Sequence, residues 1–151
     1  GSYVRDKDGV NAAYLICEMF SYYKTHGISL LDKLNEIYAK YGYCLNTLHS
    51  FEFEGVAGFT KMQEIMVKFH KGLDIIGGKK VIETLDYSKG LNGLPKSDVL
   101  KYLLEGNCSV VVRPSGTEPK LKTYISVSAE SKEAAEAMEA IMAAELAEMF
   151  K

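Results

Sequence analysis

The stretch that decides the fold is VVVRPSGTEPKLKTYISV, residues 110–127. Two runs rich in β-branched residues flank the segment RPSGTEPK, and such runs predict two antiparallel strands joined by a loop. A plain hairpin turns in about two to five residues. The segment is longer than that, stiff and polar, so we expect it to hold a ligand.

The composition of this loop favours an anion. Pro114 and Pro119 restrict the backbone at both shoulders, and Gly116 permits a positive φ, so that consecutive N–H groups can face one concavity. Arg113 ends a strand and offers a planar fork for two oxygens of one phosphate. The candidate binding residues are Arg113, Ser115, Gly116, Thr117, Lys120 and Lys122. The alternative is a polar turn whose hydroxyls satisfy only local backbone.

The surrounding segments predict an α+β domain. We expect helices at 58–70 and 131–151 and strands at 79–87, 98–106, 108–113 and 121–129. Residues 98–106 fit a strand or a short helix, and the GN turn that follows favours a strand. Short connections make these four strands an antiparallel sheet, with helices covering one face.

The first part of the chain predicts a helical pair, 9–25 and 29–40. Asp8 fits the N-cap of the first helix, and Ser29 with Asp32 fits a capping box at the second. The first helix is apolar on nearly all sides, so its surface should either be covered by a second copy in a homodimer or remain exposed. Residues 43–57 are expected to be an extended linker and hinge.

Composition excludes several classes of protein. The chain has 151 residues, a net charge of −2 and a pI of about 6.0, which disfavours a nucleic-acid binder. No apolar run reaches the roughly 18 residues of a membrane helix. The three cysteines lack metal-site or disulfide spacing, which predicts reduced, mostly buried thiols in a cytoplasmic protein. The chain does not begin with Met, so we expect a piece of a longer protein.

No segment predicts a metal site. The acidic residues of RDKD, 5–8, are expected to be solvated or to cap a helix. His26, His49 and His70 lie near element ends without shared spacing, and GGKK, 77–80, lacks the remaining residues of a phosphate-binding P-loop.

The loop and its context resemble the α-D-phosphohexomutases, the family of phosphoglucomutases and phosphomannomutases. The likeness is to the later part of the longer bacterial phosphoglucomutases. It is collinear and extends over VRDKDGVNAAYLICEM, SLLDKLNEIYAKYGYC, GFTKMQEIM and LPKSDVLKYLLEGNCSVVVRPSGTEPKLKTYISV. It implies that 3–42 ends the third domain of a four-domain enzyme and that 58–151 is its fourth, phosphate-binding domain.

The resemblance also implies a reaction. The parent enzyme would interconvert glucose 1-phosphate and glucose 6-phosphate through glucose 1,6-bisphosphate, using a phosphoserine and Mg²⁺ held by an Asp-rich loop. Neither the serine motif nor the metal loop occurs in this sequence. We therefore expect no catalytic residue and no metal ligand here, an inactive isolated chain, and two partners: a phosphorylated hexose and the remaining domains.

By the same resemblance, Arg113, Ser115, Gly116 and Thr117 hold the phosphate that is not being transferred. Lys120 and Lys122 are secondary candidates. Two alternatives remain open: a fragment of a phosphomannomutase or another phosphosugar mutase, or a stand-alone module for a phosphorylated ligand. An RNA-binding version of the latter is disfavoured by the acidic pI.

Overall fold

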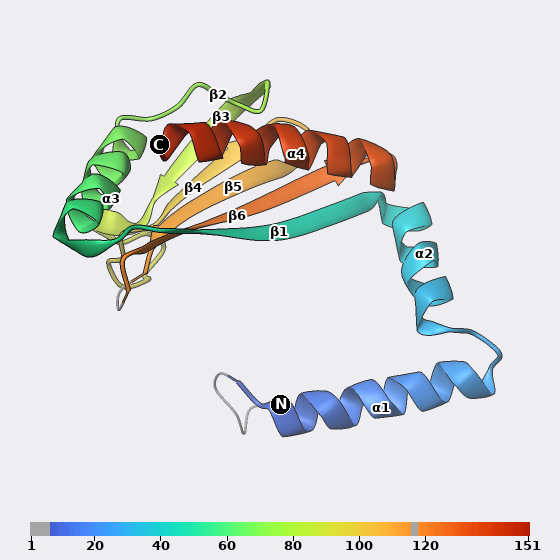
Figure 1. The fold of residues 1–151 in the computed structure, drawn as a ribbon. Helices are drawn as coiled ribbons and strands as arrows, with labels where there is room; N and C mark the ends of the chain where they lie inside the picture. The colour runs from blue at the N-terminus through green and yellow to red at the C-terminus, as the bar shows by residue number, and fades with distance from the viewer. Residues whose placement is uncertain (1–6, 116–117) are drawn as a thin grey trace. The chain divides into compact units, whose positions relative to one another are not determined.

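The computed structural model describes residues 7–115 and 118–151 and divides the chain into two compact units, Gly1–Tyr41 and Gly42–Lys151 (Figure 1). The first unit contains α1, Gly9–Thr25, and α2, Leu30–Tyr41. The second contains β1, Tyr43–Glu52; α3, Gly55–His70; β2, Ile75–Ile76; β3, Lys79–Asp86; the 3₁₀ turn η1, Tyr87–Lys89; β4, Leu100–Leu104; β5, Cys108–Pro114; β6, Lys120–Ala129; and α4, Lys132–Met149.

The two helices of the first unit begin where the sequence predicts. The Asp8 carboxylate accepts a hydrogen bond from the Asn11 N–H at 2.9 Å. The Ser29 hydroxyl accepts from the Asp32 N–H at 3.0 Å, and the Asp32 carboxylate accepts from the Ser29 N–H at 3.0 Å. Hydrogen bonds from the Ser29 side chain and backbone lower the pKa of Asp32. The expected capping box is therefore confirmed.

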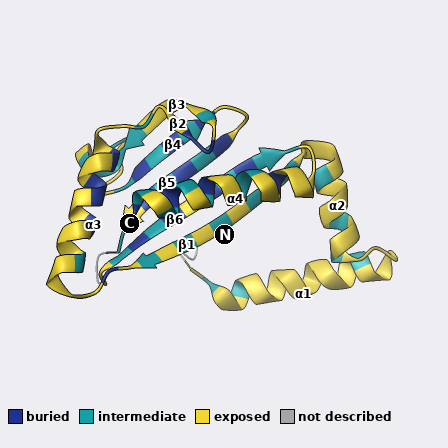
Figure 2. Ribbon diagram, turned by 45° about the horizontal axis from the view of Figure 1, so that its top comes forward, coloured by how far each residue is buried: buried dark blue, intermediate teal, exposed yellow. Residues whose placement is uncertain are grey.

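No residue of α1 or α2 is buried. Figure 2 shows both helices exposed along most of their length. The exposed large apolar side chains of α1 are Val10, Tyr14, Leu15, Ile16, Met19, Phe20 and Tyr22. The two helices of the first unit thus do not bury this apolar surface against each other, and a homodimer through α1 remains a prediction.

The second unit is built on an antiparallel sheet of six strands in the order β1-β6-β5-β4-β3-β2 (Figure 1). The four predicted strands are β3 to β6, but the predicted strand count is wrong. The two additional strands lie at the two edges. β2 has only two residues, too few for a periodic signal, and β1 falls within the segment expected to be a linker.

β1 corrects the prediction of a flexible linker at 43–57. It pairs with β6 over ten residues, from Tyr43 opposite Ala129 to Glu52 opposite Lys120. The strand forms because Tyr43, Leu45 and Phe51 pack against the core from one face. Only Gly42, with φ +90°, lies between the end of α2 and the start of β1.

The core lies between one face of the sheet and the helices α3 and α4 (Figure 2). Alternate residues of β4, β5 and β6 are buried, so their side chains share one face. The core includes Leu100, Tyr102, Leu104, Val110, Val112, Leu121, Ile125 and Val127 of the strands and Met62, Ile65, Met66, Phe69, Ala135, Met142 and Leu146 of the helices. The expected packing of helices on a single face is confirmed.

Tyr102 is a fully buried tyrosine whose hydroxyl is hydrogen-bonded inside the second unit. Its hydroxyl donates a hydrogen bond to the Phe69 carbonyl at 2.7 Å. Burial, with the nearby charge of Asp86, raises the pKa of Tyr102 to about 12. The bond therefore joins a neutral phenol of β4 to the last turn of α3.

The turn between β2 and β3 is fixed against α4. Gly77 has φ +58°, and its N–H donates to a Glu145 carboxylate oxygen at 2.6 Å. A Cβ at this position would lie 2.3 Å from the Met142 Cγ. Only glycine combines this backbone conformation with so close an approach.

A polar contact joins β1 to α4. Glu139 accepts hydrogen bonds from the Thr47 hydroxyl at 2.7 Å and contacts the His49 Nε2 at 2.6 Å. Burial raises the pKa of Glu139, but the contacts with Thr47 and His49 outweigh it, and the net shift is downward. This contact holds the edge strand β1 against α4 at Thr47 and His49, the two positions on its inner face that are not apolar.

The cysteines only partly match the expectation of buried thiols. Cys108 is buried, whereas Cys17 and Cys44 are exposed. In the part of the chain that the structure describes, no helix is long and apolar enough to cross a bilayer.

Candidate functional site

The predicted site lies at the end of the β5–β6 hairpin. Arg113 is directly opposite Lys122 across the hairpin, and Lys122 is directly opposite Ser50 on β1. Directly opposed residues share a face. Since Val112 and Leu121 point into the core, Arg113, Lys122 and Ser50 lie on the face of the sheet opposite α3 and α4. Gly116 and Thr117 lie outside the described residues, so their part in the site remains a prediction.

The backbone at the shoulders of the loop is already hydrogen-bonded. The Ser115 N–H donates to the Lys120 carbonyl at 2.7 Å, and the Phe53 N–H donates to the Pro119 carbonyl at 2.9 Å. The Ser115 N–H therefore closes the hairpin and is not free to bind an anion. The sequence predicted that consecutive N–H groups of the loop would face a ligand, and the Ser115 N–H does not. Among the described residues the Ser115 hydroxyl has no hydrogen-bond partner, so Ser115 can bind a ligand through its hydroxyl.

The three cations near the loop are not equivalent. Lys120 contacts Glu52 at 3.0 Å and Glu118 at 3.3 Å. Its hydrogen bonds to Glu52 and then Glu118 raise the pKa of Lys120, so its charge is balanced locally. Arg113 and Lys122 make no ion pair within the described chain. They are the cations available to a ligand.

Sequence reasoning missed two residues of this site, Ser50 and Glu52. Both belong to β1, which the sequence placed in a linker. Ser50 adds a hydroxyl beside Lys122, and Glu52 neutralises Lys120. A clearer strand signal in 43–52 would have placed both beside β6.

A small pocket of about 220 Å³ lies on the other, helix-bearing side of the loop. Its lining is Phe59, Met62, Gln63, Met66, Asp98, Pro114 and Ser115. The Asp98 carboxylate in its wall contacts His70 Nε2 at 2.9 Å. A carboxylate disfavours a phosphate there, so the anion site is better placed on the side of Arg113 and Lys122.

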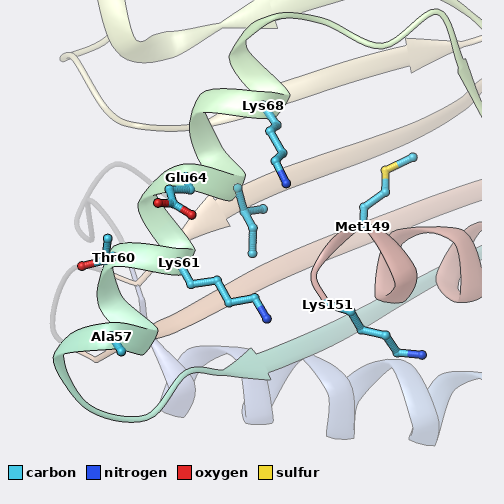
Figure 3. Close-up of a pocket in the computed structure, with 8 residues that line it drawn as sticks. Ala57, Thr60, Lys61, Glu64, Lys68, Met149 and Lys151 are labelled. Atoms are coloured by element: carbon cyan, nitrogen blue, oxygen red, sulfur yellow. The ribbon is translucent and has the colours of Figure 1, made fainter.

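A second hollow, of about 510 Å³, lies between α3 and the end of α4 (Figure 3). Lys61 and Lys68 extend from α3 into it, and Lys151 reaches it from the C-terminal end. Lys151 is paired with Glu148, and Glu64 is part of the lining. None of the predicted site residues belongs to this hollow.

The described residues contain no group of three or more His, Cys, Asp or Glu side chains that could hold a metal ion. The arrangement around the loop is suited to holding an oxyanion by charge and hydroxyl groups.

Residues 56–144 match the family model for the phosphoglucomutase/phosphomannomutase C-terminal domain. The chain belongs to this family. It is 34% identical over 143 residues to a phosphoglucomutase of Staphylococcus haemolyticus, an alignment that covers 87% of this chain and 26% of the relative. It is 37% identical over 138 residues to a phosphoglucomutase of Staphylococcus aureus, covering 83% of this chain and 25% of the relative.

A solved structure of similar fold is pp63/parafusin, a phosphoglucomutase from Paramecium in its open form. The TM-score is 0.66 at 17% identity, over 99% of this chain and 28% of that one. This likeness concerns the fold alone. The phosphohexomutase resemblance seen in the sequence is confirmed, and the chain spans about a quarter of the length of the curated relatives it matches.

Proposed function

We propose that residues 42–151 bind one phosphate group of a phosphorylated hexose on behalf of a phosphoglucomutase. The observation that carries this proposal is the row formed by Arg113, Lys122 and Ser50 at the end of the hairpin that bears the loop. Two cations without ion pairs in the described chain, fixed on paired strands, form a preorganised site for a phosphate dianion.

Each residue then has a distinct part. The Arg113 guanidinium binds two phosphate oxygens, and the Lys122 ammonium adds charge beside it. The hydroxyls of Ser115 and Thr117 donate to the remaining oxygens, with Gly116 shaping the turn between them. Lys120 keeps Glu52 and Glu118 from repelling the anion, which is a supporting role.

In the proposed parent reaction, glucose 1-phosphate and glucose 6-phosphate interconvert through glucose 1,6-bisphosphate. The bisphosphate must exchange the positions of its two phosphates between the half-reactions. A fixed site that accepts either phosphate holds the sugar equally in both orientations, and this remote binding energy helps to orient the reacting centre.

The phosphoserine and the Mg²⁺ that such a reaction uses would be supplied by the remaining domains. The described residues offer no cluster that fits a metal. The partners of this chain are therefore a phosphorylated hexose and the rest of the enzyme. We place that enzyme in the cytoplasm, and the choice between glucose and mannose lies outside this site.

The proposal is tested by titrating the chain with inorganic phosphate and with glucose 6-phosphate while recording amide NMR shifts. We expect shifts centred on residues 113–122 and a Kd of roughly 1 mM, equivalent to about 4 kcal/mol. Arg113→Ala should abolish them. Lys80→Ala, a lysine on β3 away from the loop, is the matched control and should leave binding unchanged.

Two outcomes would contradict the proposal. One is the absence of shifts at the loop with either ligand, and the other is equal binding by Arg113→Ala and the unmodified chain. A coupled assay for glucose 6-phosphate formation from glucose 1-phosphate should show no turnover by this chain alone.

A further inference from the structure

The face of the sheet opposite α3 and α4 carries three parallel rows of side chains across β1, β6 and β5. Opposed residues define them: a cation row of Ser50, Lys122 and Arg113; a tyrosine row of Leu48, Tyr124 and Val111; and a serine row of Asn46, Ser126 and Ser109. Residues two apart on a strand share a face, so the tyrosine row lies between the cation row and the serine row.

The tyrosine row is apolar and open. Tyr124 is 37% exposed and Leu48 53% exposed. In the described chain the Tyr124 hydroxyl has no hydrogen bond, so neither the ring nor its polar tip is committed to the core. An aromatic ring with a free hydroxyl, next to an aliphatic neighbour, suits a ligand that has both apolar and polar faces.

The serine row supplies hydrogen-bonding groups on the far side. The Ser126 hydroxyl donates to the Asn46 side-chain oxygen at 2.7 Å, which orients the Asn46 amide. The Ser109 hydroxyl has no partner among the described residues. Hydroxyl and amide groups held in one line are suited to the hydroxyls of a carbohydrate.

The spacing of the rows fits a single ligand. Adjacent rows are about 7 Å apart, since a strand rises about 3.3 Å per residue. A phosphate and the sugar ring that carries it through one exocyclic carbon are separated by a similar reach. Phosphate, apolar ring face and hydroxyls therefore meet cations, tyrosine and serines in that order.

We propose that Tyr124, with Leu48 beside it, stacks on the apolar C–H face of the pyranose ring whose phosphate is held by Arg113 and Lys122. This inference rests on the proposed function and adds to it a ring-recognition subsite on the open sheet. The occupant is a cyclic hexose phosphate. The order of the three rows argues for it, because a hexose phosphate presents its phosphate, its ring face and its hydroxyls in the same order.

The test uses the whole chain and three ligands: inorganic phosphate, glucose 6-phosphate, and sorbitol 6-phosphate, which carries the same phosphate on an open chain. We expect glucose 6-phosphate to bind about fivefold more tightly than the other two, because aromatic stacking contributes about 1 kcal/mol. Tyr124→Leu should remove this preference and leave the affinity for inorganic phosphate unchanged. Tyr124→Phe should keep the preference.

Tyr41→Leu, at an exposed tyrosine of the first unit, is the control and should change nothing. Equal affinity of the unmodified chain for all three ligands overturns the ring subsite while leaving the phosphate site intact. An equal loss of all three ligands in Tyr124→Leu also overturns it, since that result indicates a structural role. Failure of every ligand to bind the unmodified chain overturns both proposals.

A titration with a short single-stranded oligonucleotide tests the alternative ligand class, because the bases of single-stranded nucleic acids also stack on aromatic side chains of exposed sheets. If it shifts the Tyr124 amide more than glucose 6-phosphate does at equal concentration, the sugar assignment is wrong.

Discussion

The two units of the chain are both made from apolar sequence, but they use it in opposite ways. Gly42–Lys151 buries its apolar residues between a sheet and two helices. The helices of the first unit carry a comparable apolar content and bury none of it. Both units contain capped helices: the Asp8 side chain accepts a hydrogen bond from the Asn11 N–H, and the Ser131 side chain accepts one from the Ala134 N–H. Capping residues and helix propensity therefore specify where a helix forms, but they do not provide a hydrophobic core for it to pack against.

The difference separates two sources of stability. Caps and helix propensity contribute about 1 kcal/mol or less at each position, whereas burial of each large side chain contributes about 1.5–3 kcal/mol. We expect the second unit to fold by itself and the helical pair to depend on surfaces beyond its own.

The largest effect should come from separating the units. A chain of residues 42–151 should unfold in one cooperative transition, with a midpoint within a few degrees of the whole chain. A peptide of residues 1–41 should be mostly unfolded, because isolated helices of 17 and 12 residues are marginal in water. Circular dichroism during thermal melting checks both. A cooperative transition in the short peptide would contradict the contrast.

A matched pair of methionines, one in each unit, tests the difference in burial between the two units. Met142 is fully buried against the sheet, whereas Met19 on α1 is 43% exposed. Met142→Ala should lower the free energy of unfolding by about 2–5 kcal/mol. Met19→Ala should change it by about 0.5 kcal/mol or less. Urea unfolding followed by circular dichroism measures both, and comparable losses would show that α1 belongs to the same cooperative core.

Acid should act mainly through the second unit. The pKa of Glu139 is lowered in the folded state, so the unfolded state binds more protons in acid, and stability falls as the pH drops below about 4.5. Glu139→Gln should make this decline shallower. Asp32→Asn removes a carboxylate whose pKa is also lowered, but it should leave the decline unchanged, because Asp32 lies outside the core.

Urea unfolding at several pH values between 3 and 7 provides the measurement. Unchanged pH dependence in Glu139→Gln would show that the contact between α4 and β1 has no part in the unfolding transition.

Much of the second unit could be predicted from its sequence because its signals are local. The sequence of β4 fits a strand or a short helix, and the GN turn after it correctly favours a strand. Gly106 and Asn107 have φ +73° and +56°, as a tight hairpin turn requires. β1 was missed because Thr47 and His49 interrupt its apolar positions. Their partner is Glu139, about ninety residues away in the sequence, and no window along the chain contains that contact.

The sequence predicts which charged residues belong to the site. It does not predict which of them are neutralised by ion pairs. Arg113 and Lys122 follow from the sequence, as does the loop between them. That Lys120 is neutralised by Glu52, and that Ser50 joins the cation row, depends on the pairing of β1 with β6. The tyrosine row likewise exists only once three strands are aligned.

The attachment of the first unit to an edge strand has a mechanical consequence. Tension transmitted through Gly42 reaches β1 at Tyr43, the residue paired with Ala129. Pulling from that end loads the ladder one rung at a time, as a zipper opens, instead of shearing all rungs together. The strand should therefore peel at low force from the Tyr43 end, and the rungs from Ser50 to Glu52 should be the last to open.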